Sequence, residues 1–185
     1  MKIDIIDDFL TDYQHQSLLR TFGVIDGPKG GSSFPWYFND NLNDEERLGN
    51  FYFTNIVMDG YNILNEYWVP VFNPLLSKLN VPLNTVWRVK VNLYPRTQWR
   101  VHHKSHVDYF NDSKRINHLT TCLYYLNGSN RVTVFDGKRK VKSKQNRAIF
   151  FDGTNRHHST TPTDANFGIS INIDLINHDE DKGRM

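Results

Sequence analysis

Hydrophobic and polar residues change their spacing several times along this chain of 185 residues. The isoleucine-rich run Ile3 to Ile6 predicts a short strand. Thr11 then precedes residues 12–22, where apolar side chains recur at helical spacing, so we expect a helix with Thr11 as its N-cap. Residues 57–79 show a second helical pattern, which the two prolines inside it should interrupt or kink.

After Asn84 the period of the pattern becomes two, which indicates a strand over residues 86–94. Its apolar side consists of Val89, Val91 and Leu93. Its polar side consists of Arg88, Lys90, Asn92 and Tyr94. The pattern alone leaves two interpretations open, because the polar side could be a solvated sheet face or the wall of a ligand cleft.

Further short strands are predicted over residues 119–126, 131–135, 139–141, 147–151 and 167–175. Residues 127–130 and the pair Asp136-Gly137 supply hairpin turns between them. Short strands at this spacing, with no helical pattern among them, favour an antiparallel sandwich or barrel. We expect a single domain over residues 1–176, followed by a mobile tail over 177–185.

Composition narrows the class of protein. A content of 38% hydrophobic residues suffices for one domain with a core, and 22 basic against 20 acidic residues give a net charge of +2, which provides no specific signal for nucleic acid. The single cysteine, Cys122, lies in an apolar run and is interpreted as a buried small residue. Acidic residues interrupt the N-terminal apolar run, and no segment is long and apolar enough to predict a membrane span. We therefore expect a soluble, intracellular, cytoplasmic protein.

The triplet His106-Val107-Asp108 is the main chemical signal, followed 50 residues after Asp108 by His158. In an extended chain the side chains at i and i+2 point the same way, so His106 and Asp108 can bind one ion together. Two histidines and one carboxylate, with other positions left open, suit non-haem Fe(II). Three other histidines, His102, His103 and His118, have no comparable spacing.

Four sequence segments, in order, resemble the 2-oxoglutarate and Fe(II)-dependent oxygenases, in particular the prolyl-4-hydroxylase-like group. They are Asn92-Leu93-Tyr94-Pro95, His106-Val107-Asp108, residues 121–127, and His158 four residues before Pro162. The openings Asp8-Phe9-Leu10 and Phe34-Pro35-Trp36 further resemble small phage-borne members, which would place the protein in a host cytoplasm. The resemblance implies a mainly β fold with flanking helices, the double-stranded β-helix of jelly-roll, cupin-like proteins.

The resemblance also implies an enzyme and its site. Fe(II) would be held by His106, Asp108 and His158, with His158 preferred to His157 because the family places its distal ligand four residues before a proline. Tyr125 would bind the distal carboxylate of 2-oxoglutarate, and Tyr94 would line the pocket. With O2 as the second cosubstrate, the reaction would hydroxylate a C–H bond of a prolyl residue or of another peptide or small-molecule substrate.

The chain departs from the family at one position. An arginine or lysine normally follows the distal histidine by nine or ten residues, but Phe167 and Gly168 stand there. A buried carboxylate without a cationic partner is costly. We expect Lys90 or Arg88 to replace the missing base, because they lie on the polar side of the strand that should neighbour Gly168. The other predicted contacts to the cosubstrate come from Asn92, Ser170 and Asn172.

Two other classes of function stay open at this point. The missing base is compatible with a catalytically inactive member that uses the same barrel as a binding or structural module. A zinc hydrolase is less favoured, because no acid is placed as an evident general base beside the triad. The segments 29–31, 96–104 and 111–115 are expected to shape the entrance, and their basic residues suit a polar or acidic target.

Overall fold

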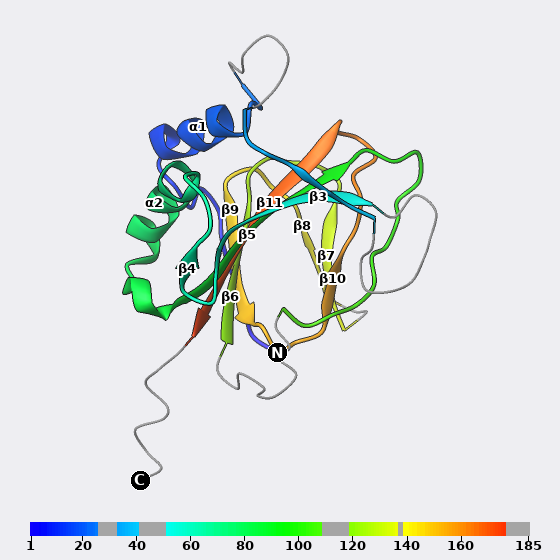
Figure 1. The fold of residues 1–185 in the computed structure, drawn as a ribbon. Coiled ribbons are helices and arrows are strands. Elements are labelled where there is room, and N and C mark those ends of the chain that lie inside the picture. The colour runs from blue at the N-terminus through cyan, green and yellow to red at the C-terminus, as the bar shows by residue number, and fades with distance from the viewer. Residues whose placement is uncertain (26–32, 41–50, 109–118, 137–138, 177–185) are drawn as a thin grey trace.

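The computed structural model describes residues 1–25, 33–40, 51–108, 119–136 and 139–176 (Figure 1). The expected tail and the second residue of the Asp136-Gly137 turn lie outside this range. The helices of the described chain are α1 (Asp12–Thr21), α2 (Trp68–Leu79) and the 3-10 turn η1 (Leu83–Thr85). Its strands are β1 (Ile3–Ile6), β2 (Tyr37–Asn39), β3 (Tyr52–Asp59), β4 (Asn62–Ile63), β5 (Val86–Pro95), β6 (Leu119–Tyr125), β7 (Val132–Phe135), β8 (Arg139–Lys142), β9 (Arg147–Asp152), β10 (His157–Ser159) and β11 (Phe167–Ile176).

The strands form two antiparallel sheets. The larger sheet has the order β1-β9-β6-β11-β5-β3-β2, with β4 paired to β3, and the smaller sheet has the order β10-β7-β8. Figure 1 shows the smaller sheet to one side of the larger and the two helices on the opposite side. This arrangement confirms the predicted mainly β fold with flanking helices. None of the described helices is both long and apolar enough to cross a bilayer.

Two clusters of buried side chains hold these layers together. The first lies where the helices meet the larger sheet and includes Leu18 of α1, Phe72 of α2 and Val91 of β5. The second includes Leu123 of β6 and Phe135 of β7, so it joins the two sheets. Burial of apolar surface on both faces explains why the larger sheet forms the centre of the molecule.

The N-terminal elements match their predictions closely. The strand over Ile3–Ile6 is β1, which pairs with β9. At the start of α1 the Thr11 hydroxyl accepts a hydrogen bond from the Gln14 amide at 3.4 Å, and the Gln14 side chain accepts one from the Thr11 amide at 3.2 Å. This capping box satisfies backbone N–H groups at the first turn and confirms Thr11 as the N-cap.

The helix predicted over residues 57–79 is wrong in its first half. Strand β3 continues to Asp59, and the chain turns at Gly60, whose φ is +54°. The helix begins only at Trp68. Pro70 lies in its first turn, where a backbone N–H has no helical partner, and Pro74 lies in its interior. Pairing with β5 places residues 53–59 in the sheet and overrides the helical spacing of the sequence.

Gly153 provides a test of how tightly the described sheet is packed near the site. A Cβ at this position would lie 2.7 Å from Leu119 Cδ2 and 2.8 Å from Thr121 Oγ1, so both side chains would have to move. We expect Gly153→Ala to lower the free energy of unfolding by about 1–3 kcal/mol in urea titrations. Gly128→Ala is the control, since its Cβ would meet nothing closer than 3.4 Å. Equal losses in both variants would contradict this account.

Candidate active site

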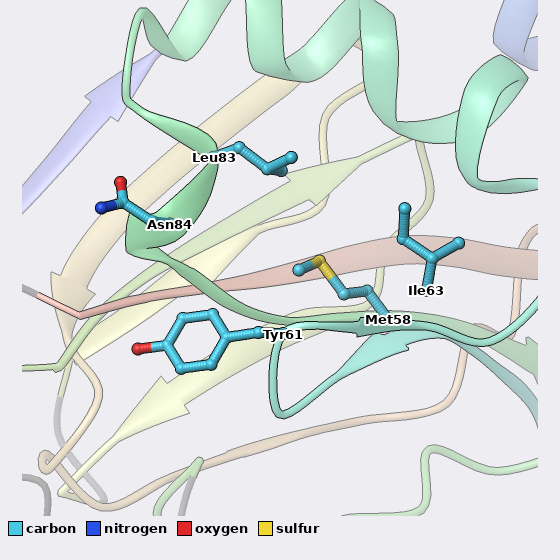
Figure 2. A pocket seen from close by; sticks show the side chains of 5 residues that line it. All are labelled: Met58, Tyr61, Ile63, Leu83 and Asn84. Carbon is cyan, nitrogen blue, oxygen red and sulfur yellow. The ribbon is translucent and has the colours of Figure 1, made fainter.

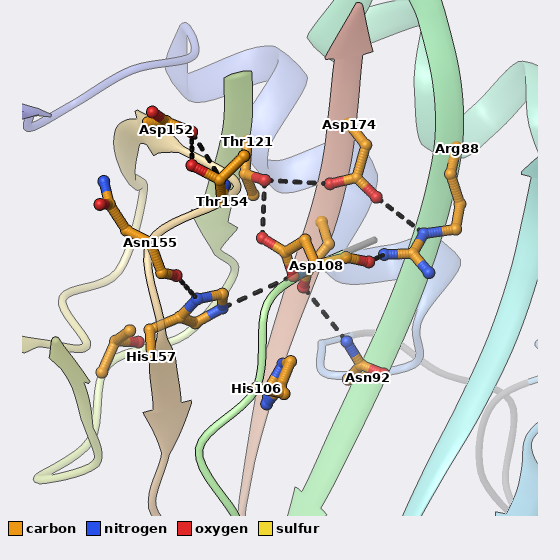
Figure 3. Close-up of polar contacts among 12 residues, drawn as sticks. Arg88, Asn92, His106, Asp108, Thr121, Asp152, Thr154, Asn155, His157 and Asp174 are labelled. Atoms are coloured by element: carbon orange, nitrogen blue, oxygen red, sulfur yellow. Dashed lines mark hydrogen bonds and ion pairs between the residues drawn. The ribbon is translucent and has the colours of Figure 1, made fainter. Parts of the chain in front are cut away.

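Three potential metal ligands converge between the two sheets. One ligand atom from each of His106, Asp108 and His157 lies within 4.8 Å of the others (Figure 3). His106 and His157 face each other in an antiparallel bridge, with N–H···O distances of 2.9 and 2.8 Å in the two directions. Directly opposed residues project to the same side of such a pair, so the backbone itself brings the two imidazoles together. Asp108 follows two residues after His106 and completes the cluster.

The structure brings His157, and not the predicted His158, into the cluster. His158 Nε2 lies 3.1 Å from Nδ1 of His102, away from the cluster, and both rings sit toward the surface. Because side chains alternate along β10, His157 and Ser159 share the inner side while His158 points outward. The count of residues to the following proline therefore favoured the histidine that lies outside the cluster.

Backbone carbonyls hold both inner imidazoles in place. His106 Nδ1 lies 3.2 Å from the carbonyl oxygen of Lys104, and His157 Nδ1 lies 3.0 Å from that of Asn155. Each carbonyl requires a proton on Nδ1, which leaves Nε2 as the nitrogen available to an ion. Metal-binding histidines commonly donate their second ring N–H in this way.

A buried polar network fixes the Asp108 carboxylate (Figure 3). Thr121 Oγ1 lies 2.6 Å from Asp108 Oδ2 and 3.1 Å from Asp174 Oδ1. Asp174 pairs with Arg88 through a 2.7 Å contact to Nε, and Arg88 Nη2 donates to the Asp108 carbonyl oxygen at 2.6 Å. One carboxylate oxygen of Asp108 is thus occupied by Thr121, and the other, Oδ1, faces His157 Nε2 at 3.5 Å.

Electrostatics favour a charged carboxylate beside neutral and cationic rings. Burial opposes the charge of Asp108, but the attraction of His157 and the hydrogen bonds from His157 and Thr121 outweigh it and lower the pKa of Asp108. Burial likewise opposes a charge on His157, yet Asp108 raises the pKa of that ring above its usual value. Burial, together with His157, lowers the pKa of His106. The cluster therefore keeps an anion in its interior, as a cation-binding site requires.

A cavity of about 30 Å³ adjoins the cluster. Its lining residues come from both sheets and are Tyr94, His106, Leu123, Arg131, Thr133, His157, Ser159, Ser170 and Asn172. From the polar side of β5, Tyr94 lines this cavity. Tyr94, Ser170 and Asn172, which were predicted to contact the cosubstrate, are among these lining residues. Asn92 is buried beside them and donates to Asn172 Oδ1 at 3.2 Å.

Tyr125 and the two expected anchors are engaged elsewhere. The Tyr125 hydroxyl is buried and donates to Thr133 Oγ1 at 2.7 Å. Arg88 is committed to the Asp174 ion pair, and Lys90 Nζ contacts the Tyr52 hydroxyl at 3.2 Å. Strand β5 does neighbour β11 as expected, but Gly168 pairs with Tyr94, while Lys90 and Arg88 lie opposite Asn172 and Asp174. Since each strand residue advances about 3.3 Å, the structure does not bring either base beside Gly168.

Sequence reasoning missed Arg131, which the structure places in the cavity. It precedes the apolar run of β7 and is only 2% exposed. One signal was available in the sequence, namely a charged residue at the start of a predicted core strand. Arginine is seldom fully buried without a partner, so such a position indicates a possible binding role.

Other predicted features lie outside the site or outside the described residues. The larger cavity in Figure 2, about 520 Å³, is lined by Met58, Tyr61, Ile63, Leu83 and Asn84 and contains no histidine or carboxylate. His118 and the entrance segments 29–31 and 111–115 lie outside the described residues. His103 is buried near the cavity, with Nδ1 2.8 Å from Ser159 Oγ.

Comparisons with solved structures extend this picture. A viral collagen prolyl hydroxylase from Paramecium Bursaria Chlorella virus-1, in a 2OG complex, matches with a TM-score of 0.54 and 20% identity over 95% of this chain and 96% of its own. A Trichoplax adhaerens prolyl hydroxylase, in complex with a hypoxia inducible factor oxygen degradation domain peptide fragment, matches with a TM-score of 0.58 and 17% identity over 99% and 87%. A Pseudomonas putida prolyl-4-hydroxylase gives 0.53 and 13% over 95% and 92%.

The chain has the prolyl hydroxylase fold. This likeness confirms the double-stranded β-helix that the four sequence segments implied. No protein-family model matches the sequence, and the search of curated proteins finds no match.

His103 gives a pH prediction. Burial, with a smaller effect of Arg131, lowers the pKa of His103 to about 3 from its usual 6.5. Below pH 6.5 this histidine therefore binds a proton in the unfolded chain, whereas in the folded chain it stays neutral down to about pH 3. The free energy of unfolding consequently falls as the pH drops through this window. For the metal-free protein we expect His103 to lower the free energy of unfolding by about 2 kcal/mol when the pH changes from 7.5 to 5.

Urea titrations at the two pH values test this expectation. His103→Asn keeps a group near Ser159 but cannot titrate, so its stability should fall by about 2 kcal/mol less than that of the wild type. His102→Asn, at an exposed ring, is the matched control and should follow the wild type. Parallel pH dependence of the wild type and His103→Asn would contradict the prediction.

Proposed function

We propose that this protein is an Fe(II)- and 2-oxoglutarate-dependent dioxygenase that hydroxylates a C–H bond. The observation that carries the proposal is the convergence of His106, Asp108 and His157, whose ligand atoms lie within 4.8 Å of one another. Two imidazoles and one carboxylate form a facial donor set that suits Fe(II) and leaves positions for other ligands. The prolyl hydroxylase fold supports the same assignment, because the cluster occupies the space between its two sheets.

The chain's own residues have distinct tasks in this proposal. His106 Nε2, His157 Nε2 and Asp108 Oδ1 would hold the metal, while Lys104 and Asn155 orient the rings through their carbonyls. Thr121 occupies Asp108 Oδ2, which favours binding through a single oxygen. When bound, iron with 2-oxoglutarate and O2 supplies the oxidising chemistry, and the protein fixes its geometry and places the substrate.

We extend the proposal to a peptide substrate, with a prolyl residue as the first candidate. Its support is that the structural neighbours include a collagen prolyl hydroxylase and a prolyl hydroxylase bound to a peptide fragment. The fold alone does not determine a substrate, so this part of the proposal needs its own assay. The inactive binding module is less favoured, because a buried cation, Arg131, does line the cavity.

Metal binding distinguishes the two neighbouring histidines. We expect His157→Ala to weaken Mn(II) or Fe(II) binding by at least 10- to 100-fold in anaerobic calorimetry, because one of three protein ligands is lost. His158→Ala is the matched control and should change the affinity less than threefold, since its ring contacts His102 instead. The reverse ranking would restore the sequence-based choice.

Turnover separates an enzyme from an inactive module. With Fe(II) and proline-containing peptides, the wild type should convert 2-oxoglutarate to succinate, and Asp108→Ala should abolish that conversion because it removes the only carboxylate of the cluster. Mass spectrometry should detect a gain of one oxygen atom on the peptide. Tight metal binding without succinate formation on any peptide would favour the binding module.

A further inference from the structure

Arg131 is a buried cation without an anionic partner in the described part of the chain. Its guanidinium carbon lies 4.5 Å from the ring centroid of Tyr94 and 5.8 Å from that of Tyr125. The only hydrogen bond that its side chain makes among the described residues is a long one, 3.5 Å from Nη1 to the Gly168 carbonyl. Aromatic faces offset only part of the cost of burying a charge. A site that keeps such a cation is suited to an incoming anion.

Gly168 explains how Arg131 comes to be there. A Cβ on Gly168 would lie 3.3 Å from Arg131 Nε and 3.4 Å from both Cδ and Cζ. The absent side chain thus leaves the space that the guanidinium uses. Side chains alternate along β11, so Gly168 faces the cavity together with Ser170 and Asn172, whereas Phe167 packs against the helix-side core.

Two other basic side chains near the cavity, Arg88 and Lys90, are less suited to bind an incoming anion. Arg88 is neutralised by Asp174 through its 2.7 Å contact. Lys90 lies over the Tyr52 ring, 5.3 Å from its centroid, and does not line the cavity. Burial, together with Arg88, lowers the pKa of Lys90 to about 8, which weakens it as a permanent cation. Arg131 alone among these three shares the cavity with His106 and His157.

We infer that Arg131 binds the distal carboxylate of 2-oxoglutarate from the space beside Gly168. This inference rests on the proposed function, because it requires the keto acid to reach the candidate metal ligands His106 and His157, which line the same cavity. The guanidinium offers a planar set of N–H donors that matches a carboxylate. The cavity holds only about 30 Å³, so Arg131 and its neighbours must shift to admit the five-carbon diacid.

The test compares two keto acids that differ only at the distal end. 2-Oxoglutarate has a carboxylate there, and 2-oxopentanoate has a methyl group. In anaerobic calorimetry with the Mn(II)-loaded protein, the wild type should bind 2-oxoglutarate more tightly. Arg131→Met should weaken 2-oxoglutarate binding by about 10- to 100-fold and change 2-oxopentanoate binding less than threefold. Lys140→Met, at an exposed lysine of β8, is the matched control and should leave both affinities unchanged.

Moving the arginine from position 131 to position 168 provides a rescue that a merely structural role could not produce. Arg131→Ala should lose discrimination between the two keto acids, and the double variant Arg131→Ala/Gly168→Arg should regain it, because the new arginine enters the space left by the old one. Circular dichroism identifies any variant that fails to fold, and Arg131→Lys then replaces Arg131→Met, with an intermediate loss expected.

The outcomes separate this inference from the proposed function. If Arg131→Met keeps its preference for 2-oxoglutarate, or if Lys90→Met loses it instead, the assignment of Arg131 is overturned while the enzyme proposal stands. If the metal-loaded wild type binds neither keto acid, the proposed function itself fails, and the role of Arg131 fails with it.

Discussion

The site depends on one backbone pairing, the two-way bridge between His106 and His157. Its hydrogen bonds of 2.8 and 2.9 Å fix which residue of β10 stands opposite the triplet, and hence which imidazole reaches the centre. A slip of one residue would present His158 and turn His157 toward the surface, because side chains alternate along a strand. Register, more than the identity of the residues, determines whether the three donors converge.

Charge is distributed around this centre in two ways. On one side, Asp174 and Arg88 neutralise each other and hold Thr121 and Asp108 in position. Burial is the main reason why the pKa of Asp174 rises to about 6, and Arg88 only partly offsets it. On the other side Arg131 carries a charge that no described carboxylate balances. One side is complete within the protein, and the other is complementary to a ligand.

Most strands of the larger sheet could be predicted from the sequence. The period-two pattern of residues 86–94 predicted the length of β5 and separated its apolar side from its polar side, because burial on one face leaves a direct mark on composition. The helical spacing of residues 57–67 was misleading, since the chain up to Asp59 belongs to β3, which pairs with β5, and Asn62–Ile63 form β4 against β3. The triplet was recognised because its two donors lie near each other in the chain.

The inward-facing histidine of β10 and the buried cation Arg131 could not be predicted from local patterns in the sequence. Which of two adjacent histidines faces inward depends on cross-strand register, and register has no local signature over a strand as short as β10. Arg131 approaches Gly168 from the other sheet, 37 residues away in sequence. A glycine in a strand indicates that another group packs closely against the backbone, but it does not identify that group.

The position of Arg131 has a mechanical consequence. Arg131 and His157 belong with the smaller sheet, whereas Ser170 and Asn172 belong to the larger one, and all four border one cavity. Any molecule held there fastens the two halves of the barrel to each other. A ligand that binds only the folded chain would also raise its free energy of unfolding by mass action, in addition to the stability that the apolar core provides.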